Sequence, residues 1–81
     1  MLTIEYQPDN SIEITVDADG LATLLAHLTS LVPGDHVHLL TPSWGGEELT
    51  EVFPRPELEP IHKVTIQLVD EAEKARMFGG R

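Results

Sequence analysis

Two groups of side chains in this sequence have the types and spacing to support a chemical or binding function. The first is the pair His36 and His38, because residues two apart on a strand point to the same face and could share a metal ion. The second is the turn around Trp44, the only tryptophan, which Gly45 and Gly46 follow directly. A tryptophan on such permissive backbone is typical of a packed corner or of a contact with another protein.

The spacing of the histidines alone predicts a metal site only weakly. A zinc site needs three or four protein ligands, and the chain has no cysteine to supply one. His27 falls beside Leu28 on a predicted helix, where we expect it to flank the core rather than to meet the strand. We therefore expect exposed histidines and no metal or other cofactor, with a metal or ligand site at His36 and His38 as the weaker alternative.

The sequence carries no catalytic signature. It lacks a cysteine nucleophile, a Gly-x-Ser-x-Gly elbow, a phosphate-binding loop and a His-Glu-x-x-His motif. Ser43 could be drawn into a triad with a histidine and Asp35, but any small protein contains such residues. Glu47, Glu48 and Glu51 stand beside a glycine turn, where solvent would keep their carboxylates ionised. We therefore expect a protein that is not an enzyme.

Trp44 has two compatible interpretations. In the structural one, the indole folds back over a sheet edge and completes a thin core. In the functional one, Trp44 anchors a protein interface, and Glu47, Glu48 and Glu51 form its acidic rim. The remaining residues of the motif have no assigned role and are Thr41, Ser43, Gly45 and Gly46.

Negative charge is concentrated in the first two-thirds of the chain. The 81 residues include 14 acidic and 5 basic side chains, which gives a net charge of -9. Residues 1–54 hold nine of the carboxylates and no lysine or arginine. Such a field repels phosphate, which argues against nucleic-acid and membrane binding, and it would attract a basic protein partner. The absence of cysteine, of a signal sequence and of a long apolar run predicts a cytoplasmic protein.

The first third of the chain predicts a hairpin and a helix. Apolar and polar residues alternate over 2–6 and 11–16, which favours two antiparallel strands joined by a polar turn. A helix follows, because Asp17 can cap its first turn and residues 33–34, Pro-Gly, can end it. Its apolar stripe consists of Leu21, Leu24, Leu25, Leu28 and Leu31.

The rest of the chain predicts further strands. Residues 36–41 favour a third strand that Pro42 ends, and residues 62–69 alternate clearly enough for a last one. A short strand over 48–53 is a weaker prediction, and the prolines of 53–60 indicate an irregular connection.

These elements predict an α+β fold in the order strand, strand, helix, strand, optional strand, strand. We expect a mostly antiparallel sheet of four to five strands with one amphipathic helix packed on one face. Residues 1–69 should form a single domain, and 70–81 a C-terminal tail that is a short helical turn or disordered. The leucine stripe should pack against the strand residues Ile4, Ile12, Ile14, Val64 and Ile66.

Residues 38–49, His-Leu-Leu-Thr-Pro-Ser-Trp-Gly-Gly-Glu-Glu-Leu, with the proline-rich link and the strand from His62, carry a family resemblance. Over about residues 2–69 the chain resembles the Imm32 family of predicted immunity proteins from bacterial polymorphic toxin systems. The resemblance implies a small α+β protein that is kept in the toxin-producing cell and neutralises a cognate toxin. It implies no catalytic residues.

The expected function is therefore that of a non-catalytic immunity protein. Its acidic surface suits a basic toxin, with a nuclease as one candidate, because nucleases bind phosphate. Two alternatives remain open. One is a small acidic structural or interaction protein, with a homodimer through a sheet edge as one form. The other is the metal binder at His36 and His38.

Overall fold

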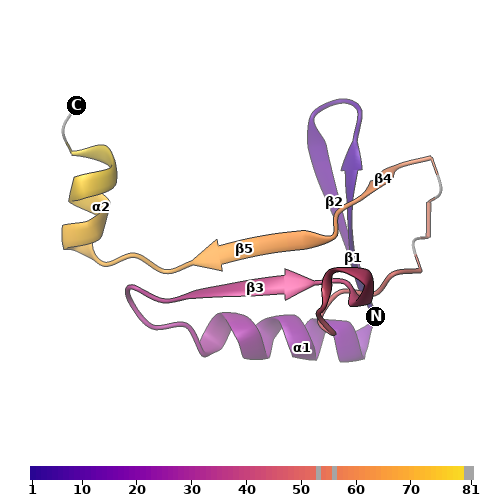
Figure 1. The fold of residues 1–81 in the computed structure, drawn as a ribbon, viewed down its shortest axis with the longest axis horizontal. Coiled ribbons are helices and arrows are strands. Elements are labelled where there is room, and N and C mark those ends of the chain that lie inside the picture. Colours follow the sequence, from indigo (N-terminus) through magenta and orange to yellow (C-terminus); the bar gives the residue numbers. More distant parts are fainter. Residues whose placement is uncertain (53, 56, 80–81) are drawn as a thin grey trace.

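The computed structural model describes residues 1–52, 54–55 and 57–79. Over these residues the chain is an α+β protein with two antiparallel sheets and two α-helices (Figure 1). Its elements are β1 (Leu2–Gln7), β2 (Ser11–Val16), α1 (Ala18–Thr29), β3 (His36–Leu40), the 3₁₀ helix η1 (Pro42–Trp44), β4 (Glu59–Pro60), β5 (Lys63–Gln67) and α2 (Glu71–Phe78). The predicted α+β class is confirmed.

The N-terminal hairpin has the two predicted antiparallel strands. β1 pairs antiparallel with β2, with Leu2 opposite Val16 and Ile4 opposite Ile14. Asn10 adopts a left-handed conformation at φ 70° in the connecting turn, and its N–H donates to the Gln7 carbonyl at 3.1 Å. On its other edge β1 pairs with the two-residue strand β4, which completes a sheet of order β2-β1-β4.

Helix α1 begins where the sequence predicted. Asp17 is its N-cap, and its carboxylate accepts a hydrogen bond from the Gly20 N–H at 2.8 Å. The Met1 amino group also donates to this carboxylate. These two hydrogen bonds, from Met1 first and then from Gly20, lower the pKa of Asp17 below its ordinary value.

The later strands form a separate sheet rather than an extension of the first. β3 and β5 pair only with each other, with Val37 opposite Ile66. The predicted single sheet of four to five strands is therefore replaced by a three-stranded and a two-stranded sheet. The predicted strand over 48–53 is wrong for residues 48–52, which are not a strand, and Phe53 lies outside the described residues.

Residues 49 and 50 connect the two sheets instead of forming a strand. The Leu49 N–H donates to the Leu40 carbonyl of the second sheet at 3.0 Å. The next N–H, of Thr50, donates to the Leu2 carbonyl of the first sheet at 2.7 Å, and the Leu2 N–H returns a bond to the Thr50 hydroxyl. These few hydrogen bonds do not form a β-ladder, but they hold the two sheets together.

The buried core is small and lies at this connection. Among the described residues, its buried apolar side chains are Leu2, Ile4, Leu39 and Leu49. The partly buried side chains that pack against them are Leu24, Val37, Ile61, Val64 and Ile66. The two sheets, α1 and the connecting segment each contribute to this core.

Much of the predicted core is exposed. Of the leucine stripe, Leu24 packs against the buried cluster, whereas Leu21, Leu25 and Leu28 are exposed. On β2, Ile12 and Ile14 are 62% and 55% exposed, although they lie on the same face of the hairpin as buried Ile4. Leu31 of the predicted stripe lies beyond the end of α1 at Thr29. The other four leucines cover a wide arc of the helix, and the rest of the chain covers only one side of that arc.

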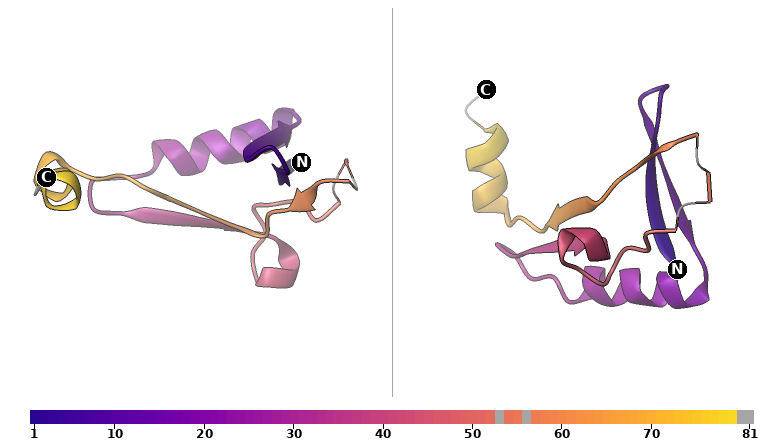
Figure 2. Two further views of the ribbon diagram at one scale, coloured as in Figure 1. Left: turned by 90° about the horizontal axis from the view of Figure 1, so that it is seen from above. Right: turned by 45° about the vertical axis from the view of Figure 1, so that its right-hand side comes forward.

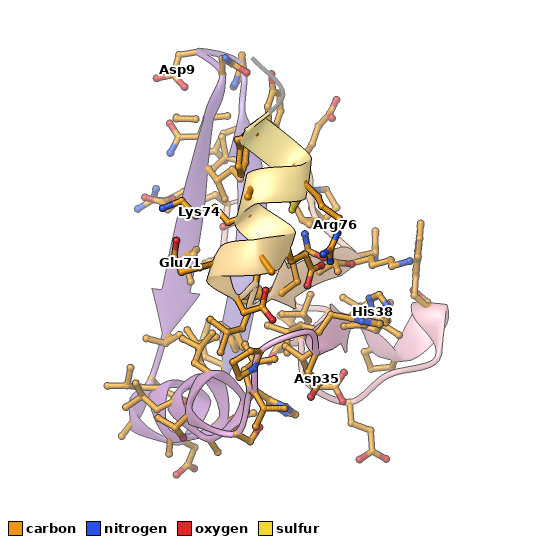
Figure 3. The ribbon with its side chains drawn as sticks, turned by 90° about the vertical axis from the view of Figure 1, so that its left-hand side faces the viewer. Asp9, Asp35, His38, Glu71, Lys74 and Arg76 are labelled. Atoms are coloured by element: carbon orange, nitrogen blue, oxygen red, sulfur yellow. The ribbon has the colours of Figure 1, made fainter. Side chains whose placement is uncertain are left out.

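Helix α2 stands apart from the rest of the structure, at the opposite end of β5 from the hairpin (Figure 1). Asp70 caps it by accepting from the Glu73 N–H at 2.7 Å, and none of its residues is buried. Figure 3 shows its charged side chains on both sides, with Glu71 and Lys74 on one and Arg76 on the other. No helix in the described part of the chain is both long and apolar enough to cross a membrane.

Glu5 is a buried acid on the face of β1 opposite to Leu2 and Ile4. Its side chain is fully buried, and neither carboxylate oxygen has a hydrogen-bond partner among the described residues. Glu13 lies directly across the hairpin and is paired with Arg55. A buried carboxylate without such a partner opposes folding.

We expect Glu5→Gln to stabilise the protein by about 1–3 kcal/mol, because a neutral amide is less costly to bury than a carboxylate whose oxygens accept no hydrogen bond among the described residues. Urea unfolding at pH 7 measures this free energy. The control is Glu13→Gln, which should give no gain because it loses the ion pair with Arg55. A Glu5→Gln variant no more stable than the parent would contradict the expectation.

Candidate functional site

The Trp44 turn projects from one side of the β3–β5 sheet, and α1 lies on the other (Figure 2). Its backbone folds back on two acceptors: the Pro42 carbonyl accepts from the Gly45 N–H at 3.0 Å, and the Thr41 carbonyl accepts twice. This oxygen accepts from the Trp44 N–H at 2.9 Å and from the Gly46 N–H at 3.1 Å. The turn is therefore closed by its own backbone directly at the end of β3.

The two glycines are required for different reasons. Gly45 ends η1 in the left-handed region at φ 91°, which side chains of L-residues rarely adopt. Gly46 packs against β3: a Cβ on it would lie 2.4 Å from the Leu40 Cβ and 2.8 Å from the Leu40 carbonyl oxygen. The pair thus lets the chain reverse and press closely on the strand.

Two of the three predicted rim acids hold the turn. Glu48 accepts from the Leu40 N–H at 3.1 Å, and Glu51 accepts from the Ser43 N–H. The hydrogen bond from Leu40 is the main reason that the pKa of Glu48 lies below its ordinary value, and partial burial opposes it. Glu47 is exposed at the surface beside them. The carboxylates of Glu48 and Glu51 therefore hold the backbone of the turn by hydrogen bonds, and they also give its surface a negative charge.

Trp44 lies at the surface and not in the core. Its side chain is 57% exposed, and its ring stacks on His62 with 5.7 Å between centroids and 5° between planes. The His62 Nδ1 is 2.8 Å from the hydroxyl of Thr41, which is fully buried. The Thr41 N–H also donates to the His62 carbonyl at 3.1 Å. The indole is thus held in a fixed orientation while one part of it faces solvent.

His62 is the residue of this site that sequence reasoning missed. The signal lies in strand register: Leu40 pairs with Lys63, so the next opposed pair beyond the ladder is Thr41 with His62. Only the correct pairing of two strands far apart in the sequence brings His62 beneath Trp44.

The structure brings His36 and His38 together as predicted. Both are exposed, and their rings meet edge to face with 4.7 Å between centroids. The His38 Nδ1 lies 2.8 Å from the Thr65 hydroxyl. Within residues 1–52, 54–55 and 57–79, no group of three or more His, Cys, Asp or Glu side chains could hold a metal ion. The pair alone does not make a metal centre.

A shallow pocket of about 150 Å³ lies between the start of α1 and residues 47–50. Asp19, Glu47 and Glu48 are among its lining residues. Sites for small organic ligands are commonly about 300–1,000 Å³ and mostly apolar. This pocket is too small and too acidic to favour such a ligand.

We expect Gly46→Ala to destabilise the protein by about 2 kcal/mol or more, because its methyl group would collide with the backbone and side chain of Leu40. Chemical denaturation measures the loss. The matched control is Gly34→Ala at φ 87°, where a Cβ meets nothing within 4 Å and only backbone strain of about 1 kcal/mol is added. Equal losses for the two variants would refute the close packing at Gly46.

The lowered pKa of Glu48 predicts an acid-sensitive contribution to stability. The unfolded state takes up this proton at a higher pH than the folded state does, so the contribution is complete above the unfolded pKa. It is lost as pH falls through the folded pKa. Melting temperatures from pH 7 to pH 3 should therefore fall less steeply for Glu48→Gln than for the parent. Parallel curves would show that the Glu48 charge adds nothing to stability.

No family model, no curated protein and no solved structure matches this chain. Any assignment of function therefore depends on the residues and surfaces described above.

Proposed function

We propose that this chain is a non-catalytic immunity protein that binds and neutralises a basic toxin protein through the surface around Trp44. The observation that carries the proposal is the exposed Trp44–His62 stack in a braced turn bordered by carboxylates. Tryptophan is enriched among the side chains that dominate protein interfaces. The resemblance of residues 38–49 to Imm32 immunity proteins supports the toxin as the partner.

The rigidity of the turn supports a binding role. Binding is weakened when side chains or loops must become ordered at the interface. Here the backbone bonds to Thr41, the stack on His62 and the carboxylate of Glu51 already order the turn. Trp44 can thus meet a partner with little further loss of conformational entropy.

The charge distribution supports a basic partner. Residues 1–54 contain nine carboxylates and no lysine or arginine, and they include the whole turn. A field of one sign can raise the association rate with an oppositely charged protein by about 10- to 1,000-fold at low salt. Rapid capture suits a protein that must reach a toxin before the toxin reaches its target.

The direct test is to sequence the genes on either side of this one and to co-express this chain with any toxin domain that they encode. We expect the parent to restore growth and to co-purify with the toxin. Trp44→Ala should weaken binding by about 30-fold or more while circular dichroism shows a folded protein. The control is Val52→Ala, which removes an 80% exposed apolar side chain outside the turn and should bind normally.

A neighbouring toxin that still kills in the presence of the parent, or that fails to co-purify with it, would overturn the proposal. Normal binding by Trp44→Ala would retain an immunity function but remove the turn from the interface. An association rate that does not fall with added salt would remove the role of the acidic field.

A further inference from the structure

The structure leaves an apolar surface uncovered along β2 and α1, which we call the open face. It consists of Ile12, Ile14 and Val16 on β2 and of Leu21, Leu25 and Leu28 on α1, all of them exposed. β2 leads into α1 through Asp17 alone, and the two elements contact each other, so the two rows meet at this junction. The open face borders the buried core, because exposed Ile14 lies directly opposite buried Ile4 in the hairpin.

The open face lacks the charge expected of a solvent-exposed surface. Surface helices normally carry charged residues opposite their buried stripe. Among the 12 residues of α1 the only carboxylate is Asp19, and there is no lysine or arginine. Leu21, Leu25 and Leu28 follow the i, i+4, i+7 spacing of a second stripe, beside the one that contacts the core through Leu24. The helix therefore has two apolar sides, of which this chain covers one.

The surface area of the chain indicates how much is left uncovered. A compact monomer of 9.0 kDa exposes about 4,900 Å², whereas this chain exposes 5613 Å². Its radius of gyration, 14.7 Å, also exceeds the roughly 12 Å of a compact chain of this length. Both the protruding helix α2, in which no residue is buried, and the exposed side chains of the open face contribute to this excess of about 700 Å².

We propose that the open face is the interface with a second copy of this chain, and that the folded protein is a homodimer joined through β2 and α1. Two observations favour a second copy over another partner. The absence of charge allows two chains of net charge -9 to meet without repulsion at this face, whereas a basic protein would prefer the acidic surface. Among the described residues the core has four buried apolar side chains, and a core of this size is stabilised by a partner that is always present.

The dimer does not depend on the proposed immunity function. The Trp44 turn and α1 lie on opposite sides of the β3–β5 sheet, so a toxin at the turn and a second copy at α1 would not compete (Figure 2). The oligomeric state can be measured on the chain alone, without a toxin.

Light scattering coupled to gel filtration, from about 5 to 500 µM, tests the proposal. We expect a mass of about 18 kDa, twice the 9.0 kDa of one chain, and a melting temperature that rises with protein concentration. Leu25→Glu should raise the dissociation constant by about 100-fold or more, because a charge would enter the apolar interface. The control is Val52→Glu, at an 80% exposed apolar residue outside the open face, and it should remain dimeric.

A second variant keeps the test informative if Leu25→Glu does not fold. The chain has no cysteine, so Leu25→Cys can form a disulfide only between two copies. Under mild oxidation at low micromolar concentration we expect a covalent dimer for Leu25→Cys and not for the control Val52→Cys. A 9 kDa parent with a concentration-independent melting temperature would overturn the proposal. A dimer that Leu25→Glu leaves intact, or equal cross-linking of both cysteine variants, would overturn it as well.

Discussion

The connection between the two sheets at residues 49 and 50 is the constraint on which the rest of the structure depends. Neighbouring N–H groups of Leu49 and Thr50 donate to opposite sheets, one to the Leu40 carbonyl and one to the Leu2 carbonyl. Leu49 and Leu2 are also two of the four buried apolar side chains. The same short segment thus supplies hydrogen bonds and core volume, so that two small sheets behave as one folded unit.

The Trp44 turn follows from this connection. Residues 41–48 span the distance between the end of β3 and the linking segment, and both ends of this loop are fixed. Among the described residues, no neighbouring strand supplies carbonyl acceptors for the N–H groups of Leu40 and Ser43 on this side. The carboxylates of Glu48 and Glu51 accept these hydrogen bonds instead. An acidic loop is for this reason also an ordered one. Charge that attracts a partner and hydrogen bonds that hold the backbone come from the same side chains.

Local pattern was enough to predict the elements that depend on neighbouring residues. The hairpin, the Asp17 cap and the shared face of His36 and His38 follow from period-2 alternation and from the chemistry of helix ends. The division into two sheets did not follow, because alternation does not say which strands pair. His62 was missed for the same reason, since only the pairing of β3 with β5 places it opposite Thr41.

The core was misjudged for a different reason. The leucine stripe and the β2 isoleucines have the pattern of buried residues, but the chain is too short to cover all of them. Apolar periodicity tells which side chains favour burial and not whether anything in the same chain is available to cover them. Exposed Ile14 opposite buried Ile4 shows this limit within a single strand pair.

The position of the sole tryptophan has a consequence for spectroscopy. All indole fluorescence of the chain comes from Trp44, which lies outside the buried cluster and rests on an imidazole ring. The emission therefore senses opening of one surface turn rather than melting of the core. Fluorescence and circular dichroism give different transition midpoints if this turn opens before the rest of the chain unfolds.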